Sequence, residues 1–207
     1  MRIKEKNYKN IYWFLSTIFH PVFVPVLLLL TCVPNVDPFH NLLIEKRILF
    51  FFLFFFLNTF LPCFFVFILY KKNLISDIEL KNKRERILPL SFTFLCLIVI
   101  FFVTKQFFLF NSIITTIILG YLLITIASLL ISLFWKVSLH MLCVGGALSA
   151  IGNNTLSFHE SYLMFYLFLF ISLILGYSRL KQNAHNKKQV ILGFLLGFVL
   201  MLFVFSY

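Results

Sequence analysis

Long runs of apolar residues dominate the chain, and short clusters of charged residues separate them. One run, RILFFFLFFFLNTFLPCFFVFILY over residues 47–70, carries a charge only at its first position. Because a helix rises about 1.5 Å per residue, a run of this length is long enough to cross a hydrocarbon core of roughly 30 Å. A helix also satisfies its own backbone hydrogen bonds inside lipid, so the pattern predicts membrane-spanning helices.

The runs together predict an all-α fold, a polytopic transmembrane helical bundle of six to seven spans. The seven candidates cover residues 12–33, 47–70, 87–104, 108–135, 138–157, 161–180 and 189–206. The third is short and the fifth is the least apolar, which leaves six as the alternative count. No soluble domain fits between the spans, so we expect residues 1–207 to form a single integral membrane domain. Gly193 and Gly197 lie one helical turn apart and predict a seam of close helix packing.

Composition narrows the class of protein and its partners. Hydrophobic residues make up 61% of the chain and the mean hydropathy is +1.00, which excludes an ordinary soluble protein. The net charge of +11 would suggest nucleic acid in a soluble protein, but here the basic residues lie between spans. The membrane bilayer, its headgroups and phosphates are therefore the expected partners, and nucleic acid is not. The four cysteines lie inside apolar runs without metal-ligand spacing, so we expect no disulfide, metal or other cofactor.

The basic residues also predict the orientation of the chain. With seven spans, the amino terminus and the loops after the second, fourth and sixth spans share one side of the membrane. That side carries all the Lys and Arg residues except Lys46, Arg47 and Lys105. The positive-inside rule makes the richer side cytoplasmic, and we expect an integral protein of a bacterial inner membrane.

Three polar clusters fall on this same side after alternate spans. They are KNKRERILP at residues 81–89, KVSLHM at residues 136–141 and SRLKQNAHNKKQV at residues 178–190. Taken singly, they are more typical of a basic flank, an interfacial histidine and a solvated loop. Taken together, they place cationic side chains, serine and two histidines where they can converge on one pocket at the headgroup level. Such a pocket suits a phosphate.

Local spacing favours this convergence. Arg179 and His185 are six residues apart, about 240° on a continuous helix, so a shared ligand requires a break between them, for which KQNA is suitable. His185 and Gln189 are four residues apart and share a face on a restarted helix, where they can hydrogen-bond. Ser138 stands where it can cap the fifth helix, whose free amides favour an anion.

These residue types fit phosphoryl transfer. An imidazole has an ordinary pKa near 6.5, is largely neutral at pH 7 and can attack phosphorus. A second, protonated histidine can give the leaving oxygen its proton, and Arg and Lys can neutralise charge on the other oxygens. The chain has no Asp-rich motif that would hold Mg²⁺, and this chemistry needs none.

The clusters resemble the type 2 phosphatidic acid phosphatase superfamily of membrane lipid phosphatases. That family carries Lys-x6-Arg-Pro, Pro-Ser-Gly-His and Ser-Arg-x5-His-x3-Asp on successive loops of one side. SRLKQNAH matches the Ser-Arg-x5-His core in full. The resemblance implies that His185 is the nucleophile that forms a phosphohistidine and that Ser178 and Arg179 bind the phosphate. It also implies that Ser138 binds phosphate and that His140 is the general acid.

The first motif departs from the family pattern. Anchoring it on Pro89 puts Lys81 in the lysine position as a phosphate ligand, but Leu88 stands where the arginine belongs. Arg84, one helical turn earlier, or Arg86, in a shifted register, can take the place of that arginine.

The other two motifs depart at single positions. Val137 and Leu139 replace the proline and glycine of the second motif, and Gln189 replaces the aspartate of the third. Gln189 can still fix the tautomer of the catalytic His185, although a neutral amide stabilises the imidazolium less than a carboxylate does. The His-x3-Gln-Val pattern is also similar to the dolichyl diphosphatase-like branch of the superfamily.

These features predict a metal-independent phosphatase that acts on a phospholipid phosphate or a polyprenyl diphosphate. The alternative is a catalytically degraded family member that binds or moves a phospholipid, because two motifs are incomplete. A prenyl transferase is disfavoured, since the chain lacks the paired Asp-rich motifs that such enzymes carry.

Overall fold

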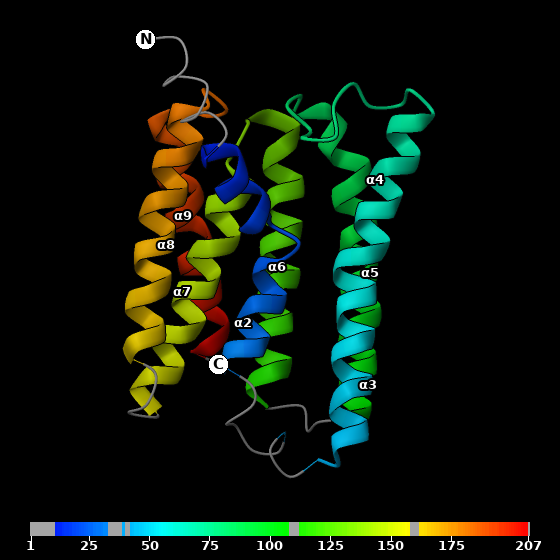
Figure 1. Cartoon of the computed structure of the whole chain (residues 1–207), viewed down its shortest axis with the longest axis vertical. Helices are drawn as coiled ribbons and strands as arrows, with labels where there is room; N and C mark the ends of the chain where they lie inside the picture. The colour runs from blue at the N-terminus through cyan, green and yellow to red at the C-terminus, as the bar shows by residue number, and fades with distance from the viewer. Residues whose placement is uncertain (1–10, 33–38, 40–41, 108–111, 158–161, 207) are drawn as a thin grey trace.

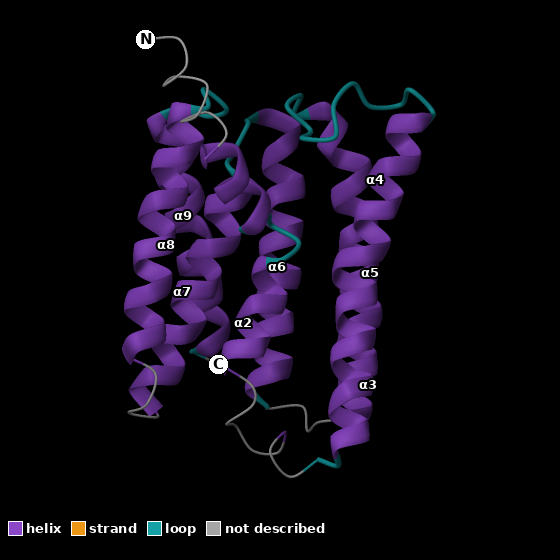
Figure 2. Cartoon of the chain, in the orientation of Figure 1, coloured by secondary structure: helices purple, strands orange, loops and turns teal. Residues whose placement is uncertain are grey.

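The computed structural model describes residues 11–32, 39, 42–107, 112–157 and 162–206, and all regular structure in those ranges is helical (Figure 1; Figure 2). The all-α prediction is therefore confirmed. The α-helices are α2 (Val24–Cys32), α3 (Ile44–Phe55), α4 (Leu61–Lys71), α5 (Ile87–Phe107), α6 (Ile113–Phe134), α7 (Leu139–Ser157), α8 (Tyr162–Lys181) and α9 (Lys187–Phe205). A π-helical turn, η2 (Phe56–Phe60), joins α3 to α4, and a 3₁₀ turn, η3 (Arg84–Arg86), precedes α5.

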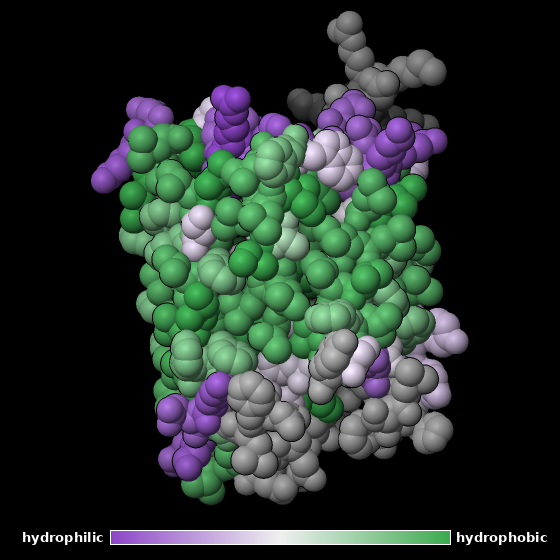
Figure 3. Space-filling view, turned by 180° about the vertical axis from the view of Figure 1, so that it is seen from behind, coloured by the Kyte–Doolittle hydropathy of each residue, from purple (hydrophilic) through white to green (hydrophobic). Residues whose placement is uncertain are grey.

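Within the described residues, five helical segments are long and apolar enough to cross a membrane, as expected for an integral membrane protein. They are Ile44–Lys71, Arg84–Phe107, Ile113–Phe134, Tyr162–Lys181 and Lys187–Phe205. A sixth helix, α7, is apolar over the shorter stretch Leu139–Asn153. The described residues thus contain five candidate spans, and the predicted count of six to seven is not confirmed. Figure 3 shows the apolar belt of the molecule between hydrophilic ends.

The expected first span, residues 12–33, is interrupted. Residues 11–18 are helical, residues 19–23 form turns, and α2 begins only at residue 24. Pro21 and Pro25 explain the interruption, because proline has no amide hydrogen and its ring clashes with the preceding turn of a helix. The amino-terminal segment is therefore two short helical pieces with an irregular backbone between them.

The π-helical turn η2 satisfies part of that irregular backbone. The Val22 carbonyl accepts hydrogen bonds from Asn58 Nδ2 at 2.8 Å and from Thr59 Oγ1 at 2.9 Å. Asn58 and Thr59 are both buried. Asn58 and Thr59 are neighbours in the chain, and both donate to the same carbonyl from the π-helical turn, whose wider winding orients side chains differently from an α-helix. Non-helical backbone at this depth is tolerated where protein groups satisfy it, as they do here.

Helices α7 and α9 pack closely along their length. A Cβ atom at Gly197 would collide with the Leu142 carbonyl, and one at Gly193 would meet the Ser138 carbonyl at 3.0 Å. The predicted small-residue seam is therefore confirmed as an intramolecular one. The Ser138 amide also donates to the Gln189 carbonyl at 3.3 Å. This seam brings the start of α7 beside the start of α9, and with them two of the three polar clusters.

The three polar clusters lie at one end of the bundle. The connections from α4 to α5, from α6 to α7 and from α8 to α9 all appear at the top of Figure 1. The break expected in KQNA is present, since α8 ends at Lys181 and α9 begins at Lys187. Asn183, at φ 54°, ends α8 in the left-handed conformation that is typical after a helix.

Candidate functional site

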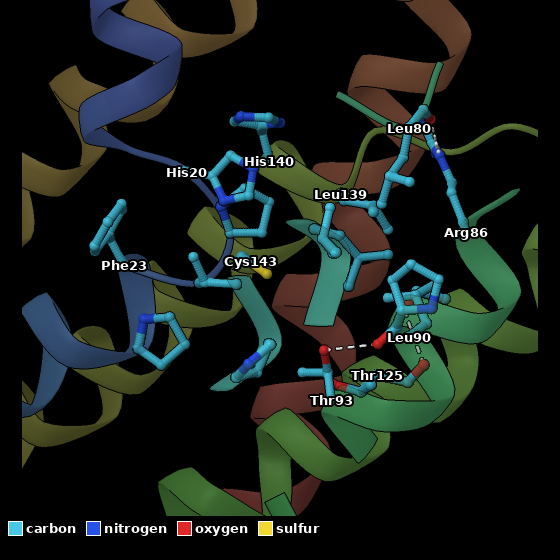
Figure 4. A pocket seen from close by; sticks show the side chains of 18 of the residues that line it. His20, Phe23, Leu80, Arg86, Leu90, Thr93, Thr125, Leu139, His140 and Cys143 are labelled. Atoms are coloured by element: carbon cyan, nitrogen blue, oxygen red, sulfur yellow. Dashed lines mark hydrogen bonds between the residues drawn. The ribbon is translucent and has the colours of Figure 1, made fainter. Parts of the chain in front are cut away.

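A cavity of about 290 Å³ lies where these connections meet the bundle. It is lined by side chains from six separate parts of the chain, of which Figure 4 shows several. The charged and imidazole side chains that line it are His20, Glu79, Arg86, His140, Arg179 and His185. The predicted convergence of the three polar clusters on one cavity is therefore observed for four residues that the sequence indicated: Arg86, His140, Arg179 and His185.

His185 is 7% exposed and sits in the turn between α8 and α9. Its Nδ1 lies 3.0 Å from Gln189 Oε1, and the Asn186 amide donates to the same oxygen at 3.3 Å. Because a backbone amide can only donate, the atom facing it must be the amide oxygen of Gln189. His185 Nδ1 therefore carries the hydrogen in the neutral ring, and Nε2 keeps its lone pair.

Gln189 both caps α9 and contacts His185. It forms a capping box with Asn186, whose side chain accepts from the Gln189 amide at 2.9 Å, and this box starts α9. The same side-chain oxygen fixes the orientation and tautomer of His185. The hydrogen bond expected from the four-residue spacing is thus present.

The electrostatic surroundings keep His185 neutral. Its pKa is lowered from the ordinary 6.5 to about 3, chiefly because burial penalises the charged ring. The hydrogen bond with Gln189 opposes that shift. Three positive side chains reinforce it, namely Arg86, Arg179 and Lys136. A neutral ring with a free Nε2 is the form in which an imidazole is a nucleophile.

Arg86 and Arg179 are the buried cations of the cavity, at 4% and 7% exposure. Arg86 donates from Nε to the Leu80 carbonyl and from Nη1 to the Val137 carbonyl, each at 2.8 Å. Arg179 donates from Nη1 to Gln182 at 3.0 Å, while its Nε is buried without a hydrogen-bond partner. Both guanidinium groups are thus held in place, and one still has an unused donor.

No carboxylate of the described residues lies within ion-pair distance of either guanidinium. Glu79 lines the cavity and its negative charge attracts Arg179, although its carboxylate pairs with Lys81 at 3.5 Å. Burying two cations beside one carboxylate that is shared with a lysine costs several kcal/mol in effective terms. The cavity therefore has the electrostatics of an anion site.

His140 and Ser138 stand at the start of α7. His140 Nε2 lies 3.1 Å from the Ser16 carbonyl, and since that oxygen can only accept, Nε2 carries a hydrogen. Ser138 is fully buried, and its hydroxyl has no hydrogen-bond partner within the described structure. The predicted cap by its side chain is therefore not formed. The Ser138 hydroxyl also does not line the cavity, so the structure does not place it at the predicted phosphate site.

Four predicted phosphate ligands do not line the cavity, and Ser138, described above, is one of them. Lys81 is exposed and pairs with Asp77 at 2.8 Å, and Arg84 is exposed on η3. Ser178 is buried, but it donates to the Tyr12 carbonyl at 2.8 Å and so faces the amino-terminal helix. Of the two candidates for the missing arginine, the structure brings Arg86 to the cavity and leaves Arg84 outside.

Sequence reasoning missed three residues at this site. His20 lines the cavity from the interrupted first segment, and its one signal was a His-Pro pair within an apolar run. Lys136 donates to the Ala184 carbonyl at 3.0 Å, and burial and the nearby guanidinium groups lower its pKa. Gln182 joins Arg179 to the amino-terminal helix, and its position in KQNA gave no signal of that.

The rest of the cavity wall is mostly apolar. It runs along α4, α5, α6 and α7, where the lining includes Pro62, Val66, Leu97, Tyr121, Ile124 and Cys143. Thr93 and Thr125 also line it, but their hydroxyls donate to carbonyls of their own helices at 2.9 and 2.7 Å (Figure 4). The cavity thus joins a cationic end to an apolar arm, which matches a molecule with a charged head and a hydrocarbon chain.

We expect His185 to stay neutral far below the ordinary titration range of histidine. In protein labelled with ¹⁵N-histidine and held in detergent micelles, its ring signals, assigned by their loss in His185→Ala, should remain those of the neutral Nδ1–H form down to about pH 5. Gln189→Glu keeps the capping box and adds a negative charge, so it should raise the pKa of His185. A midpoint near 6.5 in the unchanged protein would contradict this description of the site.

Comparison of the chain with protein-family models, with curated proteins and with solved structures gave no match in any of the three. The site itself therefore carries the functional argument.

Proposed function

We propose that this protein is a metal-independent phosphatase that hydrolyses a lipid phosphate or a polyprenyl diphosphate through a phosphohistidine on His185. One observation carries the proposal: a neutral imidazole with a free nitrogen shares a buried cavity with two guanidinium groups that form no ion pair among the described residues. The resemblance of the three motifs to the type 2 phosphatidic acid phosphatase superfamily supports the same chemistry.

In the proposed reaction, Arg86 and Arg179 bind the phosphate and neutralise its oxygens. His185 Nε2 attacks phosphorus, and the hydrogen bond from Nδ1 to Gln189 holds the ring in the attacking tautomer. The fixed donors around the phosphate act most strongly in the transition state, because little water competes with them in a buried site.

His140 supplies the proton for the leaving oxygen in this proposal. Its Nε2–H is engaged by the Ser16 carbonyl, which leaves Nδ1 as the nitrogen that exchanges a proton. Water then attacks the phosphohistidine and gives a proton back to His140. This step releases inorganic phosphate and restores the enzyme.

The apolar arm supports a lipid substrate. A chain attached to a phosphate held at Arg86 and Arg179 would lie along the wall formed by α4, α5 and α6. A water-soluble phosphate would leave this apolar surface uncovered and gain no binding energy from it.

A binding protein that has lost catalysis is the second candidate. It is favoured by Lys81 and Ser178, two of the predicted phosphate ligands, which bond elsewhere. Purified protein in detergent distinguishes the two functions when it is given phosphatidic acid or a polyprenyl diphosphate with EDTA present. We expect release of inorganic phosphate; thermal stabilisation by these lipids without release would favour the binding protein.

Arg86 and Arg84 form a matched pair for testing the phosphate site. Arg86→Ala should lower kcat/KM by about 10²- to 10³-fold, because it removes a buried cation from the phosphate, whereas Arg84→Ala should stay within about twofold. Both variants should elute as single species in size-exclusion chromatography. Equal losses of kcat/KM in the two variants would show that Arg86 does not bind the phosphate.

We also propose that the cavity end of the bundle faces the cytoplasm of a bacterial cell. Lys188, exposed beside the site, offers a probe of this orientation. In a variant without the native cysteines, Lys188→Cys should react with a membrane-impermeant maleimide only after the cells are permeabilised. Labelling of intact cells would show that the cavity end faces the outside, opposite to the proposed orientation.

A further inference from the structure

His20 reaches the cavity from the interrupted first segment. Its amide donates to the Thr17 carbonyl at 3.3 Å, and its own carbonyl accepts from Phe23 and Val24 at 2.8 and 3.2 Å. The backbone of His20 is thus satisfied where the first helical piece ends and α2 begins. The side chain takes no part in these bonds and lines the cavity.

The His20 ring lies against the ring of His140. The two centroids are 5.3 Å apart at an interplanar angle of 82°, an edge-to-face contact that Figure 4 shows. His20 Nδ1 is buried and has no hydrogen-bond partner within the described structure. A buried ring nitrogen without a partner is costly, so a histidine kept only for packing would be better replaced by an apolar ring.

The neighbouring His140 has only one ring nitrogen available for proton transfer. Its Nε2–H is bound to the Ser16 carbonyl, so one of its two nitrogens is engaged. Two imidazoles in contact, with Arg179 lining the same cavity, cannot both be charged because their positive charges repel one another. The two rings can therefore hold at most one proton between them, and the negative charge of a bound phosphate would favour its uptake. Either ring can then present that proton to the leaving oxygen.

We propose that His20 is a second catalytic proton donor, which acts with His140 to protonate the leaving oxygen; this inference rests on the proposed phosphatase function. In the first step the N–P bond to His185 forms, the P–O bond to the leaving group breaks, and its electron pair takes the proton held by the two histidines. In the second step water forms a new P–O bond, the N–P bond returns its electron pair to His185, and the proton of the water returns to the two histidines.

The leaving group of the substrate provides the test. Two phosphate monoesters with the same alkyl chain are compared, one releasing an alkanol and the other a nitrophenol. His20→Phe keeps a ring of similar shape against His140 but cannot carry a proton. It should lower kcat/KM, which reports the steps up to departure of the leaving group, by about 100-fold on the alkanol ester and by less than about threefold on the nitrophenyl ester, since nitrophenolate leaves without a proton.

Ile18→Ala is the matched control, because Ile18 lies on the same segment, is 42% exposed and does not line the cavity. If His20→Phe does not fold, His20→Gln makes the same comparison with a smaller neutral side chain. Equal losses on both esters would show a packing role, and no loss on either would show no role; each overturns the proposal for His20 alone. Absence of hydrolysis by the unchanged protein and by Ile18→Ala would instead overturn the phosphatase function.

Discussion

Replacement of His185 by alanine is expected to abolish phosphate release from a lipid phosphate, with a loss of about 10⁴-fold or more in kcat. The reason is that the proposed pathway has no second nucleophile: once the imidazole is removed, water would have to attack phosphorus directly. The arginines and the apolar arm remain, so the variant should still bind the lipid. The measurement is release of inorganic phosphate in detergent with EDTA present, together with lipid-dependent thermal stabilisation.

Lys188→Ala is the matched control for this variant. Lys188 is exposed on the first turn of α9, three residues from His185, and does not line the cavity. Its removal should leave kcat within about twofold, as for most exposed side chains away from a site. Undiminished hydrolysis by His185→Ala would sink the proposed mechanism, whatever the control does.

Loss of Arg179 is expected to have the next largest effect. Arg179→Ala should lower kcat/KM by about 10³-fold, because it removes a buried guanidinium that has a free Nε donor and no ion-pair partner among the described residues. Arg179→Lys keeps the charge but loses the planar fork, so it should recover only part of the activity. Inhibition by inorganic phosphate should weaken in the same order, since the anion uses the same donors.

Lys181→Ala removes a charge from the same helix end without touching the cavity. Lys181 is exposed and lies over the Tyr177 ring at 5.3 Å, so its loss should change neither kcat/KM nor phosphate inhibition beyond about twofold. If Lys181→Ala and Arg179→Ala lose activity equally, the loss comes from a lower positive charge at the membrane surface. The proposal that Arg179 binds the phosphate would then be wrong.

Local spacing predicted the part of the site that lies within one turn of the chain. The break between Arg179 and His185 followed from their angular separation, and the contact of His185 with Gln189 followed from a four-residue spacing. Both are properties of helix geometry, which the sequence sets directly. Apolar length likewise predicted the helices of the bundle.

Tertiary contacts decided the rest. Anchoring the first motif on Pro89 predicted Lys81 as a phosphate ligand. Arg86 lies five residues after Lys81 and two after Arg84, so the three side chains point in different directions. Arg86 is the buried one, and its Nε donates to the Leu80 carbonyl of the preceding loop. Ser178 was predicted at the phosphate, yet the amino-terminal helix packs against it. Residues that meet only after distant segments pack together, such as His20 and His140, leave almost no trace in local spacing.

The expected first span shows the same limit. Its apolar composition predicted a continuous helix, and the two prolines that interrupt it were visible in the sequence. What the sequence did not reveal is that Asn58 and Thr59 would stabilise the interruption by binding the Val22 carbonyl. That contact is what allows His20 to stand at the cavity.

Trapping the covalent intermediate tests the central claim most directly. Protein given a lipid phosphate labelled with ³²P is quenched in alkali, in which phosphohistidine survives, then digested and analysed by mass spectrometry. The account predicts phosphate on Nε2 of His185, and no label in His185→Ala. Hydrolysis of the lipid with no phosphate on His185, or with the label on another residue, would contradict it.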